Sequence, residues 1–143
     1  MAEISTQAVI DAITLALRVE YPEAVILDDA AAQGITPGAF IVTLVSAGQR
    51  QITGPRYRRG PLFDVKYFSA DSEEECRGVA DNLSMALDTV MTPGGDLLHG
   101  TGMTWHIEDY VLHFTVSYNH NVRRGQEQSF METLNIQNGG LYA

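Results

Sequence analysis

The sequence lacks several features that define large classes of proteins. It has a single cysteine, Cys76, among 143 residues. No internal disulfide can form, and a cysteine-rich zinc site is excluded too. The longest apolar runs, such as residues 40–45, are too short to cross a bilayer. The first residues lack the basic region and apolar stretch of a signal peptide, so we expect neither a signal peptide nor a membrane partner.

Basic residues are also scarce. There are 9 Lys and Arg against 18 Asp and Glu, which gives a formal net charge of −9. A free-standing nucleic-acid-binding protein is usually basic, so this balance argues against that role. Four of the basic residues nevertheless lie within a short segment: Arg50, Arg56, Arg58 and Arg59.

This basic segment leads directly into a predicted core strand. Phe63, Val65 and Tyr67 alternate with more polar residues, which is the period-two pattern of a strand. A loop on a rigid base is well placed for contact with another molecule. Arg and Tyr are favoured at interfaces, so the candidate interface residues are Arg50, Arg56, Tyr57, Arg58 and Arg59.

A basic segment on an acidic chain favours packing between copies, in which the segment of one copy meets an acidic surface of the next. The alternative is that the arginines pair within the monomer or face water.

The first predicted helix covers residues 5–20. Val9, Ile13 and Leu17 recur every four positions, which places them on one face of a helix. Ser5 or Thr6 can cap the N-terminus, and Pro22 ends the helix.

The second predicted helix begins at Ser72. Ser72 and Glu75 have the spacing of a capping box. An apolar stripe runs from Cys76 to Val90, and residues 93–95, Pro-Gly-Gly, close the helix. Cys76 lies on that stripe, so we interpret it as a small buried apolar residue rather than a nucleophile.

Strands are predicted for residues 24–27, 40–45 and 62–68, and an edge strand or arm for 130–136. Residues 102–119 predict a hairpin. Apolar residues of both its strands share one face only if Trp105 opposes Phe114 and Ile107 opposes Leu112. That register leaves residues 109–110, Asp-Tyr, as a two-residue turn.

The expected fold is therefore α+β, with two helices packed on a mainly antiparallel sheet. We expect one domain over residues 1–143, with a basic loop at 46–60 and a flexible C-terminal tail from about residue 137.

No pattern of catalytic residues is recognisable. The glycine-rich segments lack the spacing of a phosphate-binding loop, and no serine lies in a nucleophile elbow. The carboxylates are plentiful but scattered. We therefore expect no catalytic residue, no cofactor and no enzymatic activity.

Two histidines offer one alternative. The hairpin register puts His106 opposite His113 on the polar face, where two imidazoles could hold a metal. Zinc sites have three or four protein ligands, and neither Lys66 nor Glu108 obviously completes a ligand set with the two histidines. We expect no metal site, and a small metal-dependent enzyme that uses His106 and His113 is the alternative from another class.

Several short motifs follow one another along most of the chain. In order they are Arg56-Tyr57-Arg58-Arg59, Pro61-x-Phe63-Asp64-x-x-Tyr67-Phe68, Glu74-Glu75-Cys76, Gly95-Asp96-Leu97-Leu98, Gly102-Met103, Val111-Leu112-His113-Phe114, Tyr118-Asn119 and Met131-Glu132-Thr133-Leu134. This ordered series resembles the tail terminator family of long-tailed phages and prophages.

The resemblance implies a small α+β virion protein that forms a homo-hexameric ring on the head-proximal end of the tail tube. Such a ring stops tube polymerisation and offers a docking surface to the neck or head-completion proteins. It also contacts the sheath protein if the tail is contractile. The resemblance also implies that the ring assembles in the cytoplasm of the bacterial host and that DNA passes through it without specific binding. A head-tail connector or neck ring protein is the alternative reading.

Overall fold

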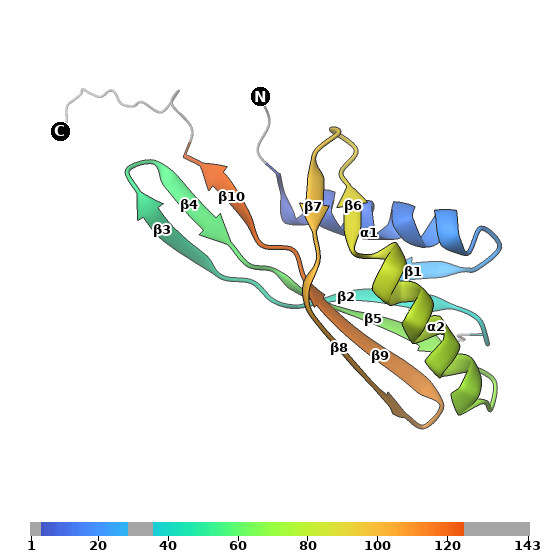
Figure 1. Ribbon diagram of the computed structural model, residues 1–143. Helices are drawn as coiled ribbons and strands as arrows, with labels where there is room; N and C mark the ends of the chain where they lie inside the picture. Colours follow the sequence, from blue (N-terminus) through green and yellow to red (C-terminus); the bar gives the residue numbers. More distant parts are fainter. Residues whose placement is uncertain (1–3, 29–35, 125–143) are drawn as a thin grey trace. The chain divides into compact units, whose positions relative to one another are not determined.

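The computed structural model describes residues 4–28 and 36–124. They form two helices and ten strands, so the prediction of an α+β fold is confirmed (Figure 1). The elements are α1 (Thr6–Glu20), β1 (Ile26–Asp28), β2 (Phe40–Ser46), β3 (Gln49–Thr53), β4 (Arg56–Arg59), β5 (Leu62–Phe68), α2 (Glu73–Ala86), β6 (Thr89–Met91), β7 (Leu97–His99), β8 (Thr101–Glu108), β9 (Val111–Ser117) and β10 (His120–Arg123).

The described chain forms two compact units. The larger one comprises 4–28, 36–48 and 59–120, and the smaller one comprises 49–58 and 121–124. No helix of these residues is both long enough and apolar enough to cross a membrane.

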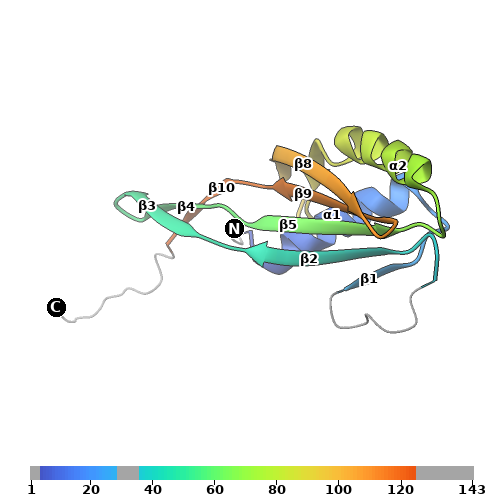
Figure 2. The ribbon, with the colours of Figure 1, turned by 90° about the horizontal axis from the view of Figure 1, so that it is seen from below.

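A five-stranded sheet with the order β1-β2-β5-β9-β8 organises the larger unit. Only β1 and β2 pair in parallel, so the sheet is mainly antiparallel, as predicted. Figure 2 shows the five strands side by side in this order, with α1 behind them. Both helices pack on the face of the sheet that carries the core cluster. The opposite face carries Asp64, Lys66, His106 and His113, together with buried Ile41.

The core lies between that covered face and the two helices. In β5 and β9 every second side chain is buried, which matches the alternation seen in the sequence. These side chains pack against the buried stripes of α1 and α2 in one apolar cluster, which includes Ile13, Leu17, Phe63, Val65, Leu83, Leu112 and Phe114.

Both helices begin where the sequence predicts. The Ser5 hydroxyl accepts a hydrogen bond from the backbone N–H of Ala8, and the Ser72 hydroxyl accepts one from that of Glu75. The Glu75 carboxylate does not complete a capping box but accepts a hydrogen bond from the Tyr67 hydroxyl. Burial and this carboxylate raise the pKa of Tyr67, so its hydroxyl stays a donor.

The predicted end of the second helix is wrong. α2 stops at Ala86, and Thr89–Met91 forms strand β6, which pairs with β7. Val90 is buried in the core, as the predicted helical stripe implied, but it lies on a strand rather than on a helix. β-branched Thr89 and Val90 favour extended backbone, and residues 92–95 form the turn of this hairpin rather than a helix stop.

The predicted basic loop at 46–60 is also wrong. Residues 49–59 form the hairpin β3-β4, which turns at Gly54 with a φ of 55°. The Gln51 side-chain amide donates to the Gly54 carbonyl over 2.8 Å, so the turn satisfies its own backbone. β10 joins β4 to give a three-stranded sheet of order β10-β4-β3, and the sequence pattern predicts no strand for residues 120–123.

Smaller differences concern the ends of elements. The first strand runs over Ile26–Asp28 rather than 24–27, and the hairpin begins at Thr101 rather than 102. The strand predicted for 130–136 and the tail predicted from residue 137 lie outside the described residues.

One buried carbonyl joins three parts of the larger unit. The hydroxyl of Tyr118, which is fully buried, donates to the Leu87 carbonyl at the C-terminal end of α2 over 2.6 Å. Gly100, between β7 and β8, packs against the same oxygen, and a Cβ there would lie 2.7 Å from it and 3.0 Å from Val116 Cγ2. Only glycine fits at position 100 without displacing these atoms.

Gly100→Ala should therefore lower the free energy of unfolding by about 1–3 kcal/mol, because the methyl group forces backbone apart in a packed core. Urea unfolding followed by circular dichroism measures this loss. Gly78→Ala is the matched control, since a Cβ at this exposed helical position meets nothing within 4 Å. Gly78→Ala should raise the free energy of unfolding by about 0.5–1 kcal/mol. Equal unfolding midpoints for the two variants would refute the packing argument.

Candidate functional site

The structure places four of the five predicted interface residues on one strand. Arg56, Tyr57, Arg58 and Arg59 form β4, and Arg50 lies on the paired strand β3. Arg50 and Arg56 are exposed, whereas the other three are half-buried. The hairpin holds these residues on ordered backbone rather than on a loop.

The two arginines that follow Tyr57 have different surroundings. Arg58 Nη1 donates to the side-chain oxygen of Asn121 on β10 over 3.0 Å, within the smaller unit. Arg59 belongs to the larger unit, where its Nη1 donates to the Ile4 carbonyl just before α1 over 3.5 Å. Arg59 therefore also holds the segment that leads into α1.

Sequence reasoning missed two further arginines of the smaller unit. Arg123 ends β10, and the backbone N–H of Arg124 donates to the Pro55 carbonyl at the tip of the β3-β4 hairpin over 2.6 Å. In the structure His120 and Val122 are buried and alternate with exposed neighbours. Four residues are too few for the sequence to predict this strand.

The two units carry opposite charge. The described residues of the smaller unit include five arginines and no Asp or Glu: Arg50, Arg56, Arg58, Arg123 and Arg124. All acidic residues of the described chain lie in the larger unit. A chain with arginines in one unit and acidic residues in the other can offer surfaces of opposite charge for association.

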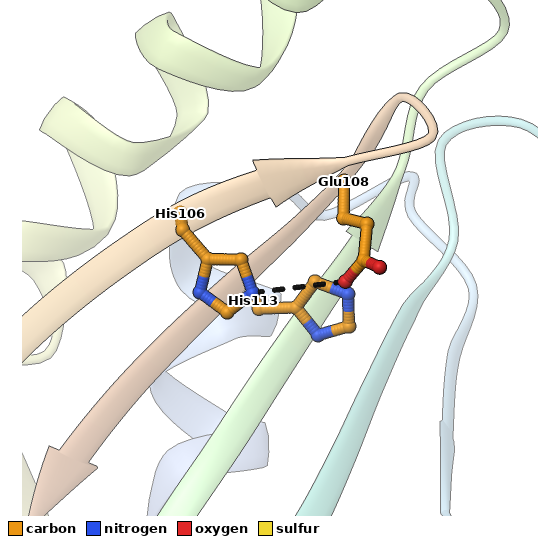
Figure 3. Close-up of side chains that lie close together, drawn as sticks. All are labelled: His106, Glu108 and His113. Carbon is orange, nitrogen blue, oxygen red and sulfur yellow. Dashed lines mark ion pairs between the residues drawn. The ribbon is translucent and has the colours of Figure 1, made fainter.

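The polar face of the five-stranded sheet holds a second cluster. His106 on β8 opposes His113 on β9, as the hairpin register predicted, and their rings stack with centroids 4.9 Å apart and planes at 9°. Glu108 Oε1 lies 4.0 Å from His106 Nε2 (Figure 3). The expectation that Glu108 would not join the histidines is corrected, because potential ligand atoms of all three lie within 4.8 Å of one another.

A buried carboxylate supports this cluster from β5. Asp64 Oδ2 lies 3.4 Å from His113 Nδ1 and 3.2 Å from the Lys66 ammonium. The Asp64 side chain is 13% exposed, and its Oδ1 is buried without a hydrogen-bond partner. Lys66 therefore pairs with Asp64 instead of serving the histidines.

The turn that sets this register matches the prediction. Trp105 opposes Phe114 and Ile107 opposes Leu112, which leaves Asp109 and Tyr110 as the two turn residues. Both have positive φ, 53° and 62°, the conformation that favours glycine and asparagine. Strand pairing therefore holds these two residues in a backbone conformation that they do not favour themselves.

Opposite charges on two parts of a chain can steer its association with a partner. The family model of the phage tail terminator protein matches residues 8–129, and the chain belongs to this family. The family is one of structural proteins, and the chain accordingly has a structural role in tail completion, as a component of the virion tail that interacts with other phage proteins.

Other comparisons add little. No match was found among curated proteins. A solved structure is similar over 84% of this chain and 96% of its own chain, with 15% sequence identity and a TM-score of 0.45, a likeness too remote to support an argument.

Replacing the hairpin turn with Asn-Gly should stabilise the protein. Asp109→Asn combined with Tyr110→Gly removes the cost of positive φ at side-chain-bearing residues and should raise the free energy of unfolding by about 1 kcal/mol. Urea unfolding measures it, and Asp109→Asn alone should give a smaller gain. A loss of stability in the double variant would show that the Tyr110 ring contributes more than its backbone costs.

Proposed function

We propose that this protein forms a homo-hexameric ring on the head-proximal end of the phage tail tube. The ring stops tube polymerisation and provides the docking surface for the neck or head-completion proteins. In a contractile tail it also contacts the sheath protein. The proposal is supported by membership of the tail terminator family and carried by the charge separation between the two units. We expect no catalytic activity.

Opposite charges on two different surfaces of one chain suit a head-to-tail contact between copies. In such a heterologous contact the basic surface of one copy meets the acidic surface of the next, and repeating it closes a ring when the rotation fits. A two-fold contact could pair the same charges, but it would close at two copies and could not build a ring of six.

The basic side of this contact, or of a contact with the tube protein, is the β3-β4 hairpin. Exposed Arg50 and Arg56 supply charge that steers the partner. Half-buried Tyr57 and Arg58 supply the aromatic and guanidinium groups that are common at interface centres. Arg59 extends the same strand, although its guanidinium also holds the backbone at Ile4.

The acidic side is the start of α2. Asp71, Glu73 and Glu74 are exposed there and form the densest acidic run of the described chain together with Glu75. Glu75 itself is engaged with Tyr67. The first helical turn also presents unpaired backbone N–H groups, so the carboxylates are favoured at this end of the helix.

The net charge of −9 suits a ring around a DNA channel. Like charges on the ring and on DNA repel, so DNA can pass through without specific binding. We place the assembly of this ring in the cytoplasm of the bacterial host.

A matched pair of charge reversals tests the hairpin. Arg50→Glu with Arg56→Glu should abolish termination, because it reverses the basic surface while leaving core side chains untouched. Electron microscopy of a phage that depends on the variant should then show tails of excessive and variable length. Arg18→Glu reverses a charge on the exposed surface of α1, outside both proposed contact surfaces, and should preserve tail length.

Compensation sharpens this test. Adding Glu73→Arg and Glu74→Arg to the hairpin variant restores opposite charges across the proposed contact and should recover normal tails. A folded hairpin variant that terminates tails normally would exclude the hairpin as the contact surface.

The same microscopy of a phage without the protein separates termination from connection. Overlong tails support the terminator role. Tails of normal length that fail to join heads favour the connector alternative, and normal particles contradict both.

A further inference from the structure

We propose that His106, Glu108 and His113 form a binding site for one Zn²⁺ ion on the face of the five-stranded sheet opposite the helices. Each residue contributes one ligand atom, and these atoms lie within 4.8 Å of one another. Two imidazoles and one carboxylate are a ligand set that zinc accepts in proteins. This inference does not depend on the ring, because all three residues come from one hairpin of a single chain.

The strand pairing brings the three side chains to the same place. His106 and His113 are directly opposite each other on β8 and β9, and Glu108 lies two residues from His106 on the same face. Figure 3 shows the two imidazoles stacked, with the carboxylate directed toward them from the end of β8. The hairpin therefore presents the donors without any change in the backbone.

The surroundings of His113 match those of a metal ligand. Its Nδ1 faces Asp64 Oδ2 at 3.4 Å, and a carboxylate there holds the proton on Nδ1. The lone pair of Nε2 is then free to bind a cation. Carboxylate, imidazole and metal in this order are the usual arrangement at zinc sites, because the outer carboxylate orients the ring and makes it more basic.

Asp64 also has an unused capacity. Its Oδ1 is buried without a hydrogen-bond partner, although Oδ2 serves both Lys66 and His113. A buried carboxylate with an unpaired oxygen gains from positive charge nearby. A cation bound through His113 would add to the positive charge that the Lys66 ammonium already places beside Asp64.

Zinc binding requires only movement of side chains. Two ligands of a tetrahedral zinc lie about 3.3 Å apart, given metal–ligand distances of about 2.0–2.1 Å. His106 Nε2 and Glu108 Oε1 are 4.0 Å apart, and their side chains are 67% and 70% exposed. Their rotation into place is unhindered by core packing.

The donor set also selects among cations. Imidazole favours zinc, copper and nickel, whereas magnesium and calcium prefer oxygen ligands. The site should therefore bind Zn²⁺ in the presence of a large excess of Mg²⁺. Three protein ligands leave one coordination position open for water or another donor.

Isothermal titration calorimetry of the full-length protein with zinc tests the proposal, together with thermal unfolding at increasing zinc concentrations. We expect one Zn²⁺ per chain, a melting temperature that rises with zinc, and no displacement by Mg²⁺. His113→Gln and His106→Gln should each abolish this binding. His99→Gln removes an exposed histidine of β7 and should bind like the unchanged protein.

Asp64→Asn tests the positioning role of the buried carboxylate. It keeps an oxygen near His113 but removes the charge, and should weaken zinc affinity by about 10–100-fold. Cobalt bound in place of zinc reports the geometry by its visible absorption, which should change in this variant. Absence of saturable binding at millimolar zinc, or equal binding by the His106→Gln and His113→Gln variants, would overturn the site. Neither result would bear on tail termination, which is scored by tail length.

Discussion

The hydrogen bond from the Tyr118 hydroxyl to the Leu87 carbonyl is the buried polar contact that ties the end of α2 to the residue that follows β9. Burial, together with the charge of Asp88, raises the pKa of Tyr118, so the hydroxyl remains a donor at any ordinary pH. The carbonyl is one of those that a helix end leaves without an intrahelical partner, and leaving it unpaired in the core would be costly. The bond thus fixes where α2 ends and where the chain leaves β9. The hairpin that carries His106 and His113 is positioned from the same point, through Gly100.

Sequence periodicity predicted the parts of this fold whose neighbours are local. The alternation around Phe63 and Phe114 identified the central strands, and pairing apolar residues across the 102–119 hairpin gave the correct register. It failed where two kinds of structure bury the same residue. Val90 continues the helical stripe of α2 in sequence, yet a strand buries it equally well. The sequence predicts a loop for the β3-β4 hairpin because its residues lack apolar alternation, and in the structure these strands are largely exposed.

The candidate sites show the same limit. The arginines of β4 could be found because they are neighbours in sequence, whereas Arg124 reaches the hairpin tip only through pairing between distant segments. The histidine pair followed from the register, but the approach of Glu108 depends on side-chain directions that a register does not give. Family membership and the geometry answer different questions: the first identifies the structural role in the tail, and the second supplies the surfaces on which the proposed contacts are based.

The lone cysteine has a consequence for following the motions of this fold. Cys76 is fully buried, with its sulfur 3.5 Å from both the Ser69 hydroxyl and the Tyr110 carbonyl, where the start of α2 meets the turn of the β8-β9 hairpin. A thiol reagent can reach it only when this junction opens. Since the chain has no other thiol, the rate of modification under native conditions reports the opening free energy of this one place. The protein thus contains its own probe of whether assembly closes the hairpin end of the sheet.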